Sequence, residues 1–304
     1  MSIRHLTGPC IGLLICTLGA SLCQASPYPF AVHTEKSGRD HLLLAHNRGP
    51  APISVRLTLS TADNVSPDQP WPMFAVVRPH SEIPLARIRP AESERGYNFS
   101  TEVSYRPGNF YALHDPQATY RLPFEAGHSV VVSQSSDGPL TTHDQANAQH
   151  AVDFTTPENT PIVAARDGIV IEAEGRNKQG GKDRVLLGLA NQIRILHADD
   201  SIATYAHLAP NGVLVAVGQK VKAGTRIGYS GSTGYSSGPH LHFVVHELQR
   251  NGDSFSSRSV PLRFHLGNPA QVFLPQYRQQ LTVAPARPGD APVGVNEKRA
   301  MKAR

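Results

Sequence analysis

Short β-type runs, separated by glycines and polar turn residues, recur along this chain and limit its fold more than any other feature. In the C-terminal half no segment has a sustained helical period. The runs there are His128–Val132, Pro161–Ala165, Gly168–Ala173, Val185–Leu189, Gln192–His197, Ala203–His207, His240–His246 and Val260–Phe264. The pattern predicts an all-β protein in which residues 124–277 form a curved, antiparallel β-sheet domain, with one polar face forming a groove.

The preceding segment, residues 26–123, offers β runs such as Ile53–Leu59 and Phe74–Val77, broken by Pro, Gly, Asn and Asp turn signals. We expect a small N-terminal β domain. His80 and His114 lie in polar, loop-like surroundings, and we expect both to be exposed to solvent. No residue pattern in this segment indicates chemistry.

The first 25 residues have the pattern of a secretory signal peptide. Arg4 precedes an apolar run, Ile11–Leu22, that is too short to span a bilayer and ends in small residues. We expect cleavage after Ala25 and an exported protein, periplasmic or extracellular. Lipidation at Cys23 is the alternative, but Leu22 stands where a small residue is expected. No second apolar segment is long enough for a membrane span.

All three cysteines, Cys10, Cys16 and Cys23, lie in this leader, so the mature chain has neither a disulfide framework nor a thiol nucleophile. Without Arg4 it keeps 28 Lys and Arg against 24 Asp and Glu, a net charge of 4 positive. Such a mild excess favours anionic surfaces such as the cell wall. No basic stripe with interleaved aromatics is present, so we expect no nucleic-acid partner. Residues 278–304, rich in Pro, Ala and Gly before a charged end, are predicted to be a disordered tail.

The strongest chemical signal is a pair of histidines, His240 and His242, within a β run. Residues two apart in an extended strand point to the same face, which is what a metal site needs. The alternative is a pair of exposed strand histidines without a ligand. Two further clusters could join them: one holds His207, and the other holds His143, His150 and Asp153. Catalytic zinc takes three protein ligands and leaves one position for water, so the three clusters supply enough ligands without saying which residues coordinate.

Several separated motifs together resemble one family. They are Asp153-Phe154, residues 160–165, Tyr205-Ala206-His207-Leu208, Gly218-Gln219-Lys220-Val221, Gly231-Ser232-Thr233-Gly234 and Gly238-Pro239-His240-Leu241-His242-Phe243. Their order and spacing over about residues 124–273 resemble the lysostaphin/LytM metallopeptidase domain. The resemblance implies one Zn²⁺ per chain with Asp153 and His242 as ligands. It implies further that His207 and His240 act catalytically, by orienting the attacking water and stabilising the oxyanion.

The first zinc ligand departs from the common family pattern, because Gln149 occupies the position four residues before Asp153. His150 lies three residues before the aspartate, and strand alternation would send it to the opposite face. His143 lies ten residues before, and one branch of the family has such a histidine, a short polar loop and an Ala-Val-Asp-Phe run. Gln134 and Gly138 fit that branch. We therefore assign His143 as the third metal ligand, with His150 as the alternative.

The resemblance implies a zinc metalloendopeptidase that hydrolyses the peptide cross-links of bacterial peptidoglycan, with stem peptides and cross-bridges as partners. We expect a monomer. The alternative is a catalytically inactive domain of this type that binds peptidoglycan or activates an amidase. Two points stay open. The first is whether the scissile bond is D-alanyl–diaminopimelate, which the absence of cysteines and the resemblance to the branch with the longer loop favour, or glycyl–glycine. The second is whether the N-terminal domain blocks the groove, positions the enzyme or binds glycan.

Three other polar residues of this region receive a structural interpretation. We expect a structural or rim role for His197 and a solvated strand end for His246. Glu247 is a conceivable general base, but the resemblance places His207 and His240 in that role instead.

Overall fold

The computed structural model describes residues 28–139, 142–266 and 271–284. The predicted signal peptide, with Cys23, and the last part of the predicted tail lie outside these residues. In the part described, no helix is long and apolar enough to cross a membrane.

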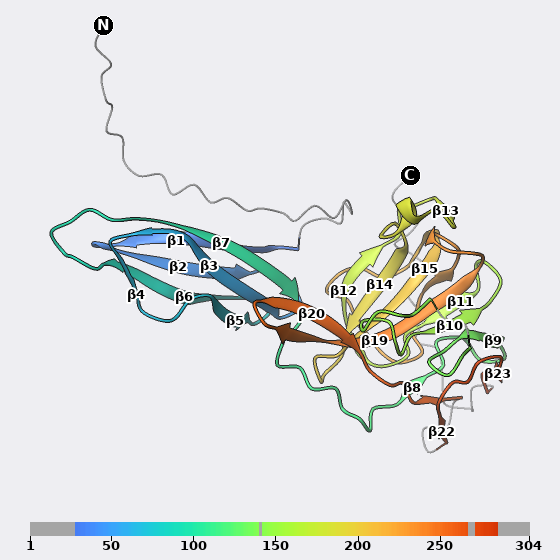
Figure 1. Cartoon of the computed structure of the whole chain (residues 1–304). Coiled ribbons are helices and arrows are strands. Elements are labelled where there is room, and N and C mark those ends of the chain that lie inside the picture. Colours follow the sequence, from blue (N-terminus) through green and yellow to red (C-terminus); the bar gives the residue numbers. More distant parts are fainter. Residues whose placement is uncertain (1–27, 140–141, 267–270, 285–304) are drawn as a thin grey trace, which may run out of the picture. The chain divides into compact units, whose positions relative to one another are not determined.

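The prediction of an all-β protein is confirmed: the described residues form strands joined by turns (Figure 1). Their one helical element is the 3₁₀-helix η1, Arg184–Leu186. The strand predicted at Val185–Leu189 is therefore wrong. Asp183 caps η1 by accepting a hydrogen bond from the Val185 amide at 3.0 Å, and the Val185 side chain is 72% exposed, without a sheet to pack against.

The chain divides into two compact units. Among the described residues, the first contains 29–48 and 53–106, and the second contains 28, 49–52 and 107–284. Residues 107–123, which the sequence analysis assigned to the N-terminal domain, thus belong with the second unit. The physical reason is apolar burial, because Tyr120 and Leu122 are fully buried in the same core cluster as Phe264.

The first unit contains two sheets. One has the strand order β1-β2-β6-β4, and the other has the order β5-β3-β7. In β3 the alternating residues Ile53, Val55 and Leu57 are completely buried, as expected of a strand with one face on a core. The bounds are β1 (Phe30–Ser37), β2 (Asp40–Asn47), β3 (Ile53–Asp63), β4 (Val65–Pro67), β5 (Met73–Val77), β6 (Ser81–Pro90) and β7 (Asn98–Pro107).

The second unit is built on a large sheet with the main order β16-β12-β14-β15-β19-β10-β9-β23 (Figure 1). These strands are β9 (Ser129–Gln134), β10 (Val152–Thr155), β12 (Gly168–Glu174), β14 (Asn191–Leu196), β15 (Ile202–Val213), β16 (Lys220–Val221), β19 (His240–Asn251) and β23 (Gln280–Thr282). At its margins lie β11 (Pro161–Val163), β17 (Arg226–Ser230) and β20 (Ser254–Ser259). Two small sheets complete the unit. One has the strand order β22-β21-β8, with β22 (Val272–Phe273), β21 (Phe264–His265) and β8 (Tyr120–Arg121), and the other pairs β13 (Gly180–Gly181) with β18 (Gly234–Tyr235).

Alternation along β19 divides its residues between two faces. Leu241, Phe243 and Val245 are fully buried in the main core, where Phe243 meets the Tyr205 ring at 5.0 Å between centroids. Burial of each such side chain contributes about 1.5–3 kcal/mol. His240 and His242, the residues on either side of Leu241, therefore point to the opposite face of the sheet.

The end of the second unit lies beyond the predicted boundary at Tyr277. Residues 280–282 form β23, which pairs antiparallel with β9, and Leu281 and Val283 are buried. This part of the predicted disordered tail is thus ordered, because its alternating apolar residues complete the core. The run predicted at Val260–Phe264 forms a strand only at its end, although Val260 and Leu262 are also buried.

Candidate metal centre and active site

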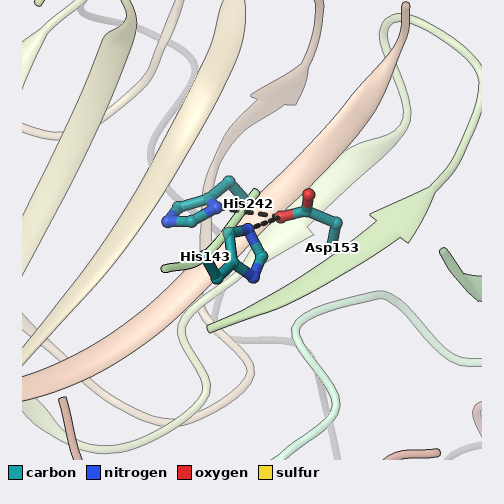
Figure 2. A group of neighbouring side chains, drawn as sticks. All are labelled: His143, Asp153 and His242. Carbon is teal, nitrogen blue, oxygen red and sulfur yellow. Dashed lines mark hydrogen bonds and ion pairs between the residues drawn. The ribbon is translucent and has the colours of Figure 1, made fainter. Parts of the chain in front are cut away.

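Three candidate ligands converge on the polar face of the sheet (Figure 2). In the pairing of β10 with β19, Asp153 lies directly opposite His242, so the two side chains share a face. Asp153 Oδ1 is 2.8 Å from His242 Nδ1 and 3.4 Å from His143 Nε2. One ligand atom of each residue lies within 4.8 Å of the others. The structure therefore brings together the set that the sequence analysis assigned to the metal.

The chemistry of this set fits a zinc ion. Two imidazoles and a carboxylate are typical ligands of catalytic zinc. Ligand atoms at tetrahedral zinc lie roughly 3.4 Å apart, and Asp153 Oδ1 is 2.8 Å from His242 Nδ1 and 3.4 Å from His143 Nε2. Burial by itself raises the pKa of Asp153, but hydrogen bonds from His143 and His242 outweigh it and hold the pKa far below its usual value. Asp153, only 3% exposed, is therefore ionised, as a metal ligand must be.

His150 lies outside this cluster. Its backbone amide donates to Ser259 Oγ at 3.1 Å, and burial together with the charge of Arg258 lowers the pKa of its ring. His143, in contrast, is buried and its ring centroid lies 5.0 Å from that of His242. The geometry thus supports His143 over His150, while coordination itself stays a prediction.

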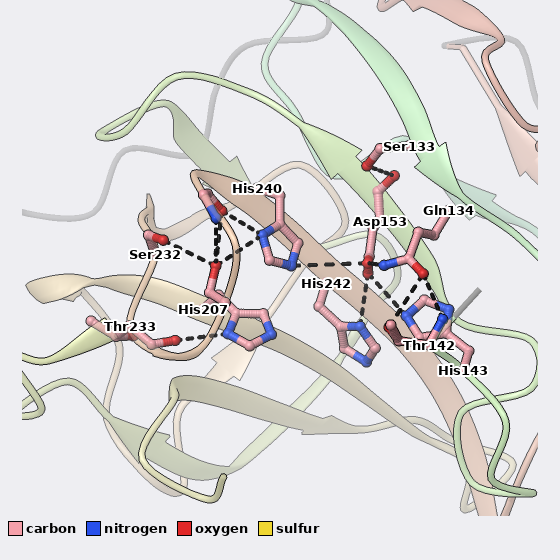
Figure 3. Close-up of polar contacts among 12 residues, drawn as sticks. Ser133, Gln134, Thr142, His143, Asp153, His207, Ser232, Thr233, His240 and His242 are labelled. Atoms are coloured by element: carbon pink, nitrogen blue, oxygen red, sulfur yellow. Dashed lines mark hydrogen bonds and ion pairs between the residues drawn. The ribbon is translucent and has the colours of Figure 1, made fainter. Parts of the chain in front are cut away.

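His207 lies beside the cluster with a fixed tautomer. Its Nδ1 donates to the Thr233 carbonyl at 2.7 Å, so the neutral ring carries its lone pair on Nε2. The ring centroid is 4.6 Å from that of His240 and 5.9 Å from that of His242 (Figure 3). Burial, followed by the neighbouring His240 and His242, lowers the pKa of His207 to about 4. The ring is therefore neutral near pH 7 and able to accept a proton.

His240 completes the group from the start of β19. Its Nδ1 donates to the Gly238 carbonyl at 2.8 Å, and its Nε2 is 3.9 Å from Asp153 Oδ2. The side chain is 15% exposed, so it can meet a ligand from solvent. The two histidines predicted to be catalytic thus flank the candidate metal ligands on the same face.

The loop that contains Thr233 orients the His207 ring, and the residues that shape this loop have no catalytic role. Thr233 Oγ1 donates to the Leu208 carbonyl at 2.7 Å and accepts from the Asn191 amide at 2.9 Å. Gly234 has a φ of +78°, and a Cβ there would lie 2.6 Å from the Ala190 nitrogen. The Gly-rich stretch around residue 234 therefore fixes the Thr233 carbonyl that orients the His207 ring.

A comparison with protein families decides what kind of domain this is. The model of peptidase family M23 matches residues 147–256, a span that includes Asp153, His207, His240 and His242. The chain carries an M23 peptidase domain. His143 lies just before the matched span, which is consistent with its unusual distance from Asp153.

Individual relatives agree with this assignment of the M23 domain. A glycyl-glycine endopeptidase, ALE-1 of Staphylococcus capitis, is 38% identical over 124 residues, 40% of this chain and 30% of the relative. The peptidoglycan DD-endopeptidase ShyC of Vibrio cholerae is 34% identical over 196 residues, 62% of this chain and 41% of the relative. The chain thus spans less than half the length of these curated relatives.

Among solved structures, the catalytic domain of the antimicrobial peptidase lysostaphin from Staphylococcus simulans is 33% identical in sequence to this chain. The match covers 42% of this chain and 84% of that domain, with a TM-score of 0.29.

Sequence reasoning did not assign a role to Gln134 beyond the resemblance. In the M23 domain its side chain contacts both Asp153 and the residue before His143. A glutamine at the end of a β run has no spacing that would reveal this, because both contacts depend on how distant segments meet.

Two expectations about surrounding histidines are wrong. His246, predicted at a solvated strand end, is 8% exposed, and its Nε2 accepts from Arg194 at 2.9 Å. The reason is that β19 continues five residues further, to Asn251, and pairs with β20, where His246 lies opposite Ser259. His114, predicted to be exposed, is half-buried, with Nε2 3.1 Å from the Tyr120 hydroxyl.

The structure agrees with what the sequence predicts for three further residues, His197, Glu247 and His80. His197 is buried with Nδ1 donating to the Asp167 carbonyl at 2.8 Å, which is a structural role. Glu247 is buried and ion-paired with Arg258 at 2.5 Å. Neither residue belongs to the His143, Asp153 and His242 group. His80 is exposed, as expected.

Two of these buried histidines should make the M23 domain acid-sensitive. Burial lowers the pKa of His197 to about 4 and that of His246 to about 3, whereas both have a pKa near 6.5 when unfolded. Between pH 6.5 and 4 the unfolded chain therefore binds protons that the folded chain does not, so stability falls as the pH falls. We expect a loss of about 3 kcal/mol by pH 4 from His197 alone.

Urea unfolding in the presence of a chelator, at pH 7.5 and at pH 4.5, measures this loss. The double variant His197→Gln, His246→Gln has no proton to gain at these positions, so its stability should change less between the two pH values. Equal pH dependence of the variant and the wild type would refute the explanation.

Proposed function

We propose that the chain is a zinc metalloendopeptidase that hydrolyses the peptide cross-links of bacterial peptidoglycan. The observation that carries the proposal is the convergence of His143, Asp153 and His242 on one sheet face, with His207 and His240 beside them. The M23 match supports a peptidase, and the retention of Asp153, His207, His240 and His242 supports an active one over a degenerate binding domain.

Each residue has a task that its surroundings permit. A zinc ion held by His143, Asp153 and His242 would lower the pKa of a water molecule and polarise the scissile carbonyl. His207, neutral with its lone pair on Nε2, accepts the proton of the attacking water. His240, whose Nδ1 is held by the Gly238 carbonyl, presents Nε2 toward the developing oxyanion and donates to it when protonated.

The proposal includes the substrate, which is a cell-wall peptide, and the compartment, which is outside the cytoplasmic membrane. Relatives named as peptidoglycan DD-endopeptidase and glycyl-glycine endopeptidase both support cell-wall peptides as the substrate class. The secretory pattern of the leader favours export. The absence of cysteine from residues 26–304, together with the resemblance to the family branch with the longer loop before Asp153, favours a periplasmic enzyme that cleaves D-alanyl–diaminopimelate cross-links. We expect it to act as a monomer. Glycyl–glycine bridges are the alternative substrate.

The deciding experiment measures zinc content and the muropeptides released from sacculi by the purified chain of residues 26–304. We expect about one zinc per chain and cleavage of cross-linked muropeptides. His143→Ala should lose both, whereas His150→Ala, a nearby histidine outside the cluster, should keep both. A wild-type chain that binds no zinc and releases nothing would refute the peptidase and favour a binding or amidase-activating role.

A further inference from the structure

Gln134 connects two of the three candidate ligands. Its Nε2 donates to Asp153 Oδ2 at 2.6 Å. Its Oε1 accepts from the Thr142 backbone amide at 2.8 Å and from the Thr142 hydroxyl at 3.2 Å (Figure 3). Thr142 directly precedes His143, so one side chain touches a candidate ligand at one end and the chain beside another at its other end.

An irregularity of the sheet delivers Gln134 to this place. In the pairing of β9 with β10, Val132 lies opposite Phe154, and a regular register would then put Ser133 opposite Asp153. The register shifts between Asp153 and Phe154, so Gln134 faces Asp153 instead. A β-bulge of this kind re-aims a side chain, and here it brings the amide onto the face of the candidate metal centre.

The contact also distinguishes the two oxygens of Asp153. Oδ2 accepts the Gln134 amide, whereas Oδ1 faces His242 Nδ1 at 2.8 Å and His143 Nε2 at 3.4 Å. Glutamine does not titrate, so its amide stays a donor at every pH. It therefore directs one oxygen away from the cluster and leaves the other for a metal.

His143 lies outside the strands, so its position relative to Asp153 depends on contacts such as those of Gln134. It lies ten residues before Asp153, outside any strand, so no sheet register fixes its distance from the aspartate. The two hydrogen bonds from Thr142 to Gln134 supply that constraint. We infer, on the basis of the proposed zinc site, that Gln134 is the positioning residue that orients Asp153 and places the His143 loop for metal binding.

The test is Gln134→Met in the chain of residues 26–304, which keeps the side-chain length and removes both polar groups. Zinc affinity is measured by competition with a chromophoric chelator. Loss of a residue that orients metal ligands typically costs 10–100-fold in affinity, and we expect a loss of about that size. The absorption spectrum of the Co²⁺-loaded chain, which reports coordination geometry, should change as well.

Gln192→Met is the matched control. Gln192 also donates Nε2 to a carboxylate, Glu172 Oε1, at 2.5 Å on the same sheet, but it lies on β14, two strands from His242. We expect it to keep wild-type zinc affinity and an unchanged Co²⁺ spectrum. If metal-free Gln134→Met does not fold, Gln134→Glu decides, because it keeps the acceptor for Thr142 and replaces the donor to Asp153 with a like charge.

The possible outcomes test the positioning role of Gln134 separately from the proposed zinc peptidase function. Wild-type zinc affinity in folded Gln134→Met, or in Gln134→Glu where that variant decides, refutes the positioning role alone. Absence of zinc binding by the wild-type chain refutes the proposed function and the positioning role with it.

Discussion

Replacing His242 by alanine is expected to abolish stoichiometric zinc binding and to lower peptidase activity at least about 1,000-fold. The reason is that a metal polarising the carbonyl contributes several kcal/mol to the transition state, and each 1.36 kcal/mol is a factor of ten in rate. His242 belongs to the candidate cluster, with its Nδ1 2.8 Å from Asp153 Oδ1. Zinc content and kcat/KM on a cross-linked muropeptide measure the effect.

The fold of this variant should survive, because the His242 side chain is 18% exposed and faces away from the core. In the presence of a chelator, the midpoint of thermal unfolding should therefore stay close to that of the metal-free wild type. Cleavage at more than a tenth of the wild-type rate by His242→Ala would contradict its assignment as a ligand.

His207→Asn should lower kcat by about 100–1,000-fold while zinc stays bound. The expected size is that of losing a general base or an oxyanion donor. Asparagine is the right replacement because His207 has a φ of +62°, which Asn tolerates better than most residues. Its short amide retains the backbone conformation but cannot accept a proton where His207 Nε2 does.

His80→Asn is the matched control for His207→Asn. His80 is also a histidine with positive φ, +50°, but it is exposed and belongs to the first unit. Its replacement should leave kcat unchanged. If His207→Asn lost zinc as well as activity, His207 would have to be counted among the ligands, and the separation between ligand and catalytic histidines would be wrong.

The sequence predicts strand faces well in this chain because alternation is a local property. At the start of the His240–His246 run, alternation places Phe243 in the core and His242 on the opposite face, as observed. Hydrophobic pattern also predicts the strand at Ile53–Leu59. Where apolar residues did not pack on a sheet, as at Val185, the same pattern gave a wrong strand.

Only the site residues that stand in recognisable sequence motifs could be predicted with their roles. Asp153 and His242 stand in motifs, but the position of His143 depends on a loop, and the bulge that brings in Gln134 leaves no mark on the hydrophobic pattern. The burial of His246 likewise depends on β20, a neighbouring strand contributed by a later part of the chain. Such long-range contacts decide burial and are not visible in local sequence.

β23 has a practical consequence for any shortened form of the protein. It covers the outer side of β9, the strand that ends in Gln134, and it does so with residues beyond Tyr277. A chain cut at Tyr277 would leave the amides and carbonyls of β9 as an unpaired sheet edge. Such an edge recruits strands from other molecules, so the shortened protein should aggregate through the side of the domain that lies next to the candidate metal centre.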